Sequence, residues 1–365
     1  MMMKKVVFAL IALMIAVPVL AQQQQNFVYT DATTLPVFGK LTPDTYGPFS
    51  RLPESLKGVT RDPVWTLGLA SAGIFVRFSS NAGVFRFRWT STFKKLMDNM
   101  APCGTRGLAL YIYEKGEWFY GGTARPNLES KTSEFNISCA GTNGAFRDYM
   151  LYLSLYDGVD SLSIGVPQGK VLTTPIANSP RADKPVIIYG SSILQGASAS
   201  HPGMASTNQI ARRLNRVVIN LGFSGNGKLD YEIAEYIASH PDPGVVVLDN
   251  VPNCTPDMIR ERQIPFYEII RKAHPTVPIV FVDGPVYPGV RFDAGKARVG
   301  QFKSEAFQEV FAKIKATGDK NVYFVSSEKI LEADNVGTIE GTHFTDIGFL
   351  KYADVLTPVL QKLLK

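Results

Sequence analysis

The chain has 365 residues, of which 45% are hydrophobic and 19% charged, a balance typical of a folded protein and not of a disordered one. This length favours two domains over one. The formal net charge is +6, but lysine and arginine are scattered, without a block of like charges or a basic run interleaved with aromatic residues. We therefore expect no nucleic-acid partner.

The N-terminus has the pattern of a secretory signal peptide. Lys4 and Lys5 precede an uncharged apolar run at 6–20, and Ala21 offers a small residue for cleavage. We predict a signal peptide over residues 1–21 and an exported protein, periplasmic or secreted, with no stable membrane span after cleavage. The alternative is an uncleaved anchor, but the run is short for a span of about 20 residues.

Residues 22–172 have the pattern of β-structure. Apolar residues alternate along 74–78 and 85–89, and further strand-like runs occur at 107–113, 118–120, 149–156 and 161–166. Asp157 and Gly158 supply a turn between the last two runs. Period-two alternation with glycine-rich turns predicts antiparallel strands with one buried face, in a β-sandwich or jelly roll.

The three cysteines, Cys103, Cys139 and Cys254, do not form a metal-binding pattern. In an oxidising compartment Cys103 and Cys139 could pair, because both fall in the N-terminal half. Three separate buried thiols are an equally good interpretation.

After residue 172 the pattern changes to alternating strands and helices. Segment 173–185, with prolines and no periodicity, is predicted to be a linker to a second domain at 186–365. Apolar runs at 186–189, 217–221, 245–248, 279–282 and 322–325 are separated by helical stretches at 204–214, 229–239, 256–273 and 297–315. A last helix is expected at 345–364, where Pro358 could introduce a kink. This order predicts a parallel sheet covered on both faces, a three-layer α/β/α fold.

Small and polar residues follow four of the predicted strands. Ser192 comes after the first, Gly225 after the second, Asn253 after the third, and Glu340 with His343 after the fifth. Because the carboxyl ends of parallel strands meet at one edge of a sheet, we expect these residues to converge on one crevice.

These residue types suit acyl transfer. A serine hydroxyl needs an imidazole within hydrogen-bond reach to take its proton. A glycine lets a backbone N–H approach the substrate, and an asparagine amide adds a neutral donor for the developing oxyanion. The set predicts Ser192 as nucleophile and His343 as its base, without a metal or an organic cofactor.

The C-terminal half resembles the SGNH/GDSL hydrolases, whose domain is flavodoxin-like. Residues 190–193 are similar to the first block, with Ser192 as the nucleophile, and Gly225 and Asn253 match the second and third blocks. Residues 340–343 match the final Asp-x-x-His block, with Glu340 in place of Asp. The resemblance implies a Ser192-His343-Glu340 triad. It also implies an oxyanion hole of the Ser192 and Gly225 N–H groups and the Asn253 amide.

The N-terminal half resembles the GxDLY domain that precedes such hydrolases in Bacteroides-type two-domain esterases. Residues 107–111 carry the signature, with Ala109 in place of Asp. The resemblance implies a jelly-roll-like domain and a substrate that is an acylated carbohydrate. Ser191 stands where the GDSL name would put Asp, and if the longer Glu340 fails to reach the imidazole the site would be a Ser–His dyad.

Only four histidines compete for the role of base. His240 and His274 precede prolines at predicted helix ends, where surface positions are expected, and His201 lacks an acidic partner in the sequence. His343 alone has a carboxylate three residues before it. The substrate wall is predicted from residues next to the site in sequence: Met204, Phe223, Val251 and Phe344.

Each motif also has an interpretation without catalysis. Ser192 could be a turn or helix-capping serine, Gly225 simple turn chemistry, and Asn253 an Asx-turn. Asp283 could be a metal ligand but is more simply a solvated strand end. The glycines at 222–227 lack the spacing of a phosphate-binding loop.

The sequence therefore predicts a serine esterase that hydrolyses short acyl esters, above all acetyl esters of carbohydrates. An acyltransferase with the same site is one alternative. A carbohydrate-binding protein on an inactive hydrolase scaffold is another. A lipase is disfavoured, because the sequence shows no extended apolar lid.

Overall fold

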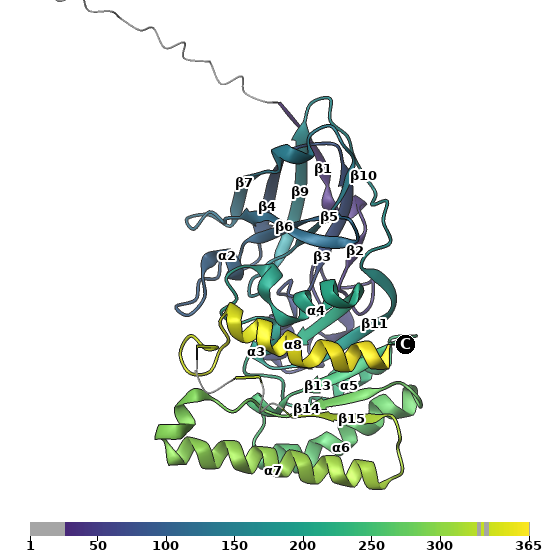
Figure 1. Ribbon diagram of the computed structural model, residues 1–365, viewed down its shortest axis with the longest axis vertical. Helices are drawn as coiled ribbons and strands as arrows, with labels where there is room; N and C mark the ends of the chain where they lie inside the picture. Colours follow the sequence, from purple (N-terminus) through teal and green to yellow (C-terminus); the bar gives the residue numbers. More distant parts are fainter. Residues whose placement is uncertain (1–25, 327–329, 332–335, 365) are drawn as a thin grey trace, which may run out of the picture.

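The computed structural model describes residues 26–326, 330–331 and 336–364. The predicted signal peptide lies outside the described residues. Figure 1 shows a β-rich N-terminal half at one end of the molecule and an α/β C-terminal half at the other. None of the helices within the described ranges is both long enough and apolar enough to cross a membrane.

The N-terminal half contains two antiparallel sheets. The four-stranded sheet has the order β1-β9-β4-β7 and the six-stranded sheet the order β10-β3-β8-β5-β6, with β2 paired to β3. Their bounds are β1 Phe27–Asp31, β2 Val37–Phe38, β3 Phe75–Ser80, β4 Val84–Ser91, β5 Leu108–Glu114, β6 Glu117–Ala124, β7 Thr132–Ser138, β8 Arg147–Tyr152, β9 Val159–Pro167 and β10 Leu172–Thr173. Short helices connect them: η1 Ala32–Thr34, η2 Glu54–Leu56, α1 Asp62–Gly68, α2 Pro102–Thr105 and η3 Ala140–Thr142.

The two sheets share one hydrophobic core. Phe87 of β4 and Ile164 of β9 pack in the same buried cluster as Phe78 of β3 and Tyr149 of β8. In β4 buried and more exposed residues alternate, as the sequence pattern predicts. The six-stranded sheet differs from the expectation of one buried face, because all residues of β3 are buried. Its second face is covered by the C-terminal half.

The C-terminal half is built on a five-stranded sheet of the order β12-β11-β13-β14-β15, in which every pair is parallel. Numbered along the chain this is the 2-1-3-4-5 order of flavodoxin-like folds. The strands are β11 Arg181–Gly190, β12 Arg216–Gly222, β13 Val245–Asp249, β14 Ile279–Val282 and β15 Val322–Val325. β11 begins within the segment expected to be the linker.

Helices cover both faces of this sheet, which confirms the three-layer prediction. On one face α4 and α8 pack against Ile188 and Val247, and on the other α5, α6 and α7 pack against Ile187 and Leu248. The helices are α3 Ser192–Gln195, η4 Pro202–Met204, α4 Ser206–Leu214, α5 Tyr231–Ala238, η5 Val251–Asn253, α6 Pro256–Ala273, η6 Pro288–Phe292, α7 Ala294–Ala316 and α8 Asp346–Leu363. Pro358 lies inside α8, which continues to Leu363.

The two halves are packed together through a hydrophobic contact. Phe75, Tyr111 and Tyr152, on the outer face of the six-stranded sheet, belong to the same buried cluster as Ile219 and Leu221 of β12. β12 is the edge strand of the parallel sheet, so the β-rich half covers that edge. This arrangement brings loops of the N-terminal half close to the carboxyl ends of the parallel strands.

The three cysteines are free thiols. Cys139 and Cys254 are buried and Cys103 is half-buried. Burial raises the pKa of the Cys254 thiol to about 11, so it is protonated at neutral pH. The structure thus agrees with the interpretation of three separate thiols and not with a pairing of Cys103 with Cys139.

Candidate active site

Ser192 lies where β11 gives way to α3. The strand ends at Gly190, Ser191 is the N-cap, and Ser192 is the first helical residue, with 7% of its surface exposed. Gly190 is required by close packing, because a Cβ there would lie 2.4 Å from the carbonyl oxygen of Asp249 on β13. The first turn of a helix leaves backbone N–H groups without intrahelical acceptors. The Ser192 N–H is one of these groups.

His343 approaches Ser192 from the loop that precedes α8. Its Nε2 lies 2.9 Å from the Ser192 Oγ. The loop is closed by backbone hydrogen bonds from the Ile339 N–H to the His343 carbonyl and from the Thr345 N–H to the Gly337 carbonyl. Thr345 also caps α8, so the histidine lies two residues before the N-cap of a long helix whose apolar face is buried.

Glu340 holds the other side of the imidazole. One carboxylate oxygen, Oε1, lies 2.7 Å from His343 Nδ1 and 2.8 Å from the backbone N of the same residue. A carboxylate accepts only, so Nδ1 carries the proton and Nε2 is left to accept a proton from Ser192. The glutamate side chain, although longer than that of aspartate, therefore reaches the imidazole of His343.

Gly225 lies in the turn after β12. This turn is tied to the Ser192 segment by hydrogen bonds from the Phe223 N–H to the Gly190 carbonyl and from the Ser224 N–H to Gln195 Oε1. Gly225 has a φ of +67°, while a Cβ added there would meet nothing within 4 Å. Backbone conformation, and not lack of space, is what favours glycine at this position.

Asn253 joins the third strand end to the second. Its Oδ1 accepts a 3.2 Å hydrogen bond from the backbone N–H of Gly227, and a Cβ on Gly227 would lie 2.3 Å from the Gly190 carbonyl oxygen. The four predicted segments therefore come together at one edge of the sheet. Because Oδ1 is engaged, the Asn253 NH2 group is the part of the amide left to donate; within the described residues it has no protein partner.

Three of the four residues predicted to form the substrate wall lie in the hydrophobic core. Phe223 and Phe344 are fully buried, and Val251 is 2% exposed; all three pack in the hydrophobic clusters on the two faces of the parallel sheet. Met204 is only partly buried, at the edge of one cluster. Adjacency in sequence does not imply a shared direction, because the large apolar side chains of Phe223, Val251 and Phe344 turn into the core.

The other histidines lie elsewhere. His201 stacks on Tyr120 of β6 at 4.6 Å between ring centroids, and burial lowers its pKa to about 4. His240 is half-buried and lines the cavity described below. His274 is at the end of α6 as predicted, but the expectation of a surface position was wrong, because it is only 8% exposed.

Asp283 is held by protein donors. Its carboxylate accepts hydrogen bonds from the Ser304 Oγ at 2.6 Å and from the Gly284 N–H at 2.8 Å. Among the residues that the structure describes, no group of three or more His, Cys, Asp or Glu side chains is placed to hold a metal ion.

Two polar residues near the site were missed by the sequence analysis. Asn99, from the β-rich half, places its Nδ2 3.4 Å from Glu340 Oε2. Asp249 lies beside Gly190 at the end of β13 and accepts a 2.9 Å hydrogen bond from the Tyr352 hydroxyl of α8. Burial raises the pKa of Asp249 to about 7, against the opposing effect of that hydrogen bond. Asp249 could have been found from the sequence, because a carboxylate there follows an apolar run. Asn99 lies in an irregular segment and has no such signal.

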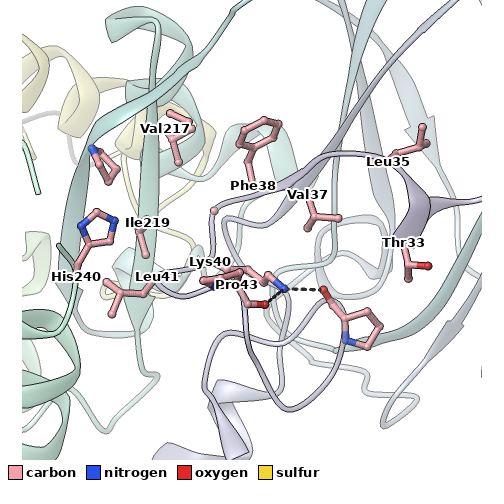
Figure 2. Close-up of a pocket in the computed structure, with 14 residues that line it drawn as sticks. Thr33, Leu35, Val37, Phe38, Lys40, Leu41, Pro43, Val217, Ile219 and His240 are labelled. Carbon is pink, nitrogen blue, oxygen red and sulfur yellow. Dashed lines mark hydrogen bonds between the residues drawn. The ribbon is translucent and has the colours of Figure 1, made fainter. Parts of the chain in front are cut away.

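Two cavities lie away from Ser192. One of about 410 Å³ lies between the β-rich half and β12, lined among others by Phe38, Lys40 and His240 (Figure 2). Another, of about 440 Å³, is formed by the β-rich half around Arg125 and Phe135. Neither is lined by Ser192 or His343. The His343 side chain is 24% exposed, so the site opens at the molecular surface.

Comparisons with known proteins identify relatives of both halves of the chain. The profile of the GDSL-like lipase/acylhydrolase family matches residues 183–361, and the profile for the N-terminus of SGNH-hydrolase-type esterases, named GxDLY, matches residues 27–172. A protein from Bacteroides ovatus described as a GDSL-like lipase has a crystal structure that superposes with a TM-score of 0.88 at 31% identity, covering 93% of this chain and 98% of its own. The chain belongs to the GDSL-like lipase/acylhydrolase family. It is therefore an esterase.

Other solved structures share the fold of this GDSL hydrolase. A salicylyl-acyltransferase from a tetracycline biosynthetic pathway has a TM-score of 0.74 at 17% identity, covering 92% of this chain and 97% of its own. A family two carbohydrate esterase from Cellvibrio japonicus has a TM-score of 0.60 at 12% identity, covering 93% and 98%. No curated protein gives a significant sequence match.

Proposed function

We propose that this GDSL hydrolase removes short acyl groups, above all acetyl, from carbohydrates, with Ser192 as nucleophile. The observation that carries the proposal is the continuous chain of contacts from Ser192 Oγ to His343 Nε2, 2.9 Å, and from His343 Nδ1 to Glu340 Oε1, 2.7 Å. A serine hydroxyl becomes a useful nucleophile only when such a base takes its proton.

The chemistry takes place in two steps. The Ser192 Oγ attacks the ester carbonyl carbon while its proton passes to His343 Nε2, and the imidazolium then protonates the leaving alcohol. Water, deprotonated by the same nitrogen, attacks the acyl-enzyme and releases the acid. Glu340 stabilises the imidazolium in both steps through Nδ1.

The negative charge on the carbonyl oxygen needs donors placed in advance. We assign these to the N–H groups of Ser192 and Gly225 and to the NH2 of Asn253. Support comes from the hydrogen bond between Asn253 Oδ1 and the Gly227 N–H, which fixes the orientation of the amide. Fixed donors stabilise an oxyanion without reorganising during the reaction.

The preference for short acyl groups follows from packing. The apolar residues next to the site in sequence are buried in the protein core: Phe223, Val251 and Phe344. The two cavities of about 410 and 440 Å³ are not lined by Ser192. A long acyl chain would remain largely in water and gain little from burial, whereas an acetyl group needs little enclosure.

A carbohydrate leaving group is supported by the open position of the site and by proteins of similar fold. The structures with this fold include the Cellvibrio japonicus carbohydrate esterase and an acetyl xylan esterase from Butyrivibrio proteoclasticus, at 12% and 13% identity. Together with the signal peptide proposed for residues 1–21, this favours action on glycans outside the cytoplasm.

Acyl transfer to an acceptor hydroxyl is a second candidate. The fold of the salicylyl-acyltransferase covers 92% of this chain. An acceptor alcohol would replace water in the second step and use the same residues.

The decisive experiment compares Ser192→Ala with Ser191→Ala. Both remove one hydroxyl from adjacent buried serines, but only Ser192 contacts His343. On p-nitrophenyl acetate we expect Ser192→Ala to lower kcat by at least about 10³-fold and to abolish labelling by a fluorophosphonate. Ser191→Ala should keep both. An active Ser192→Ala protein would refute the assignment, and a wild-type protein that is neither active nor labelled would favour a binding function.

Substrate class is tested with p-nitrophenyl esters of increasing chain length and then with acetylated xylan, with and without free sugar acceptors. Release of acetate from xylan, with rates that fall beyond short chains, is expected. Acylated sugar in place of free acid would favour the transferase.

A further inference from the structure

The β-rich half contributes a side chain to the proposed triad. We infer that Asn99 is a positioning residue that holds the Glu340 carboxylate in the plane of the His343 imidazole. The inference rests on the proposed function and adds to it a role for the N-terminal half in catalysis.

The contact geometry shows which atom of Asn99 acts. Its Nδ2 lies 3.4 Å from Glu340 Oε2 and 3.3 Å from His343 Nδ1. Nδ1 already donates its proton to Glu340 Oε1, so it has no lone pair to accept a second hydrogen bond. The amide proton is therefore directed to Oε2.

The opposite orientation of the amide is unfavourable. It would place the Asn99 carbonyl oxygen 3.4 Å from the carboxylate oxygen with no proton between them. Two acceptors at that distance repel each other. The Asn99 amide is thus a donor to Glu340.

Glu340 needs such a donor because of its length and exposure. Its side chain is 39% exposed, and it has one more rotatable bond than aspartate. Oε1 takes both donors from His343, and Asn99 is the protein donor to Oε2 within the described residues. Without Asn99 the carboxylate is free to turn Oε2 toward water, which draws Oε1 out of line with Nδ1.

Asn99 is held in place by its neighbours. Met97 and Met100 form a β-bridge with each other on either side of it. Met100 is 5% exposed and Met97 is partly buried, and both pack in the cluster that contains Ile193 and Phe344. The loop is thus anchored in a buried cluster that also contains Ile193 and Phe344, the residues that follow Ser192 and His343 in the sequence.

The test is a double-mutant cycle in the full chain. The variants are Asn99→Ala, Asn99→Leu, which keeps the side-chain volume, Glu340→Ala and Asn99→Ala/Glu340→Ala. Asn136→Ala is the matched control, because its exposed amide also contacts a charged side chain, Arg86, on the outer surface of the β-rich half. The readouts are kcat and KM on p-nitrophenyl acetate and thermal unfolding.

We expect Asn99→Ala and Asn99→Leu to lower kcat about 10-fold with little change in KM, as the loss of a hydrogen bond to a charged group implies. In the Glu340→Ala background Asn99→Ala should have no further effect, because its target is gone. Asn136→Ala should match the wild type.

Two results would overturn the inference: wild-type kcat in both Asn99 variants, or equal losses from Asn99→Ala with and without Glu340. Each of these leaves the proposed function intact as long as Ser192→Ala is inactive. Conversely, if Ser192→Ala is active, the proposed function fails before the cycle is measured. If Asn99→Ala lowers the melting temperature, the volume-matched Asn99→Leu variant shows whether the fall in kcat occurs without that loss of stability.

Discussion

Arg51 of the β-rich half donates a 2.7 Å hydrogen bond from Nη1 to the carbonyl oxygen of Gly222, the last residue of β12. The same guanidinium reaches the carbonyl oxygens of Asn220, Ala70 and Leu67, so that one side chain joins both halves of the molecule. Arg51 is 1% exposed, and burial lowers its pKa to about 10, which still leaves it charged at neutral pH.

Replacement of Arg51 by Met should therefore destabilise the protein strongly. The carbonyl groups lose their donors while remaining buried, and we expect a loss of about 3–5 kcal/mol in the free energy of unfolding. Urea unfolding followed by circular dichroism measures it. Arg88→Met is the control, because Arg88 is about half exposed and should cost less than about 1 kcal/mol. A loss below that of the control would show that the contact between the halves does not depend on Arg51.

Gly225→Ala should lower activity through backbone strain. At a φ of +67° alanine costs about 1 kcal/mol, and relief of that strain moves the N–H that we assign to the oxyanion hole. Gly116→Ala is matched to it: Gly116 has a φ of +90°, its added Cβ also meets nothing within 4 Å, and it lies in the turn between β5 and β6. We expect similar losses of stability and a fall in kcat for Gly225→Ala alone. Equal kcat values in the two variants would remove Gly225 from the oxyanion hole.

Asn253 should be tested with Ala and Asp. Aspartate keeps an acceptor for the Gly227 N–H but loses the NH2 donor, whereas alanine loses both. Loss of an oxyanion donor lowers kcat by about 10²–10³-fold, so we expect both variants to fall in that range on p-nitrophenyl acetate. If Asn253→Asp kept wild-type kcat, the amide would serve only to hold the loop.

Asp249→Asn should make the protein less sensitive to alkaline pH. Folding raises the pKa of Asp249 from 3.8 to about 7, so the neutral carboxyl stabilises the fold fully below about pH 4 and this contribution is lost as the pH rises through 7. Asparagine cannot ionise and still accepts from Tyr352. The difference in urea midpoint, variant minus wild type, should thus increase as the pH is raised from 5 to 8. A difference between variant and wild type that stays flat with pH would contradict the raised pKa of Asp249.

The parallel sheet and its helices could be predicted from sequence because local signals mark them. The helix at 256–273 and the strand at 279–282 coincide with α6 and β14, since Thr255 and Pro256 mark the helix start and an uninterrupted apolar run marks the strand. β7 was missed because only two of its seven residues, Phe135 and Ile137, are apolar: its sequence is TSEFNIS.

The site could be predicted only in part. Residues at strand ends converge because of sheet topology, which explains the contact between Ser192 and His343. Asn99 and Arg51 could not be foreseen, because their partners lie in the other half and depend on how the two halves dock. Phe223 and Phe344 are buried because large apolar side chains favour the core, whatever their distance in sequence from the site.

The contact of Phe75, Tyr111 and Tyr152 with the edge of the parallel sheet limits how such enzymes can be recombined. An edge strand covered by aromatic rings cannot be exposed without uncovering apolar surface and unpaired backbone groups. Exchanging one half for that of a distant relative would therefore disturb the fit of the rings on Ile219 and Leu221, as well as the anchoring of the loop around Asn99. Selection is expected to act on the two halves as one inherited unit, so that substitutions on one side of this contact are compensated on the other.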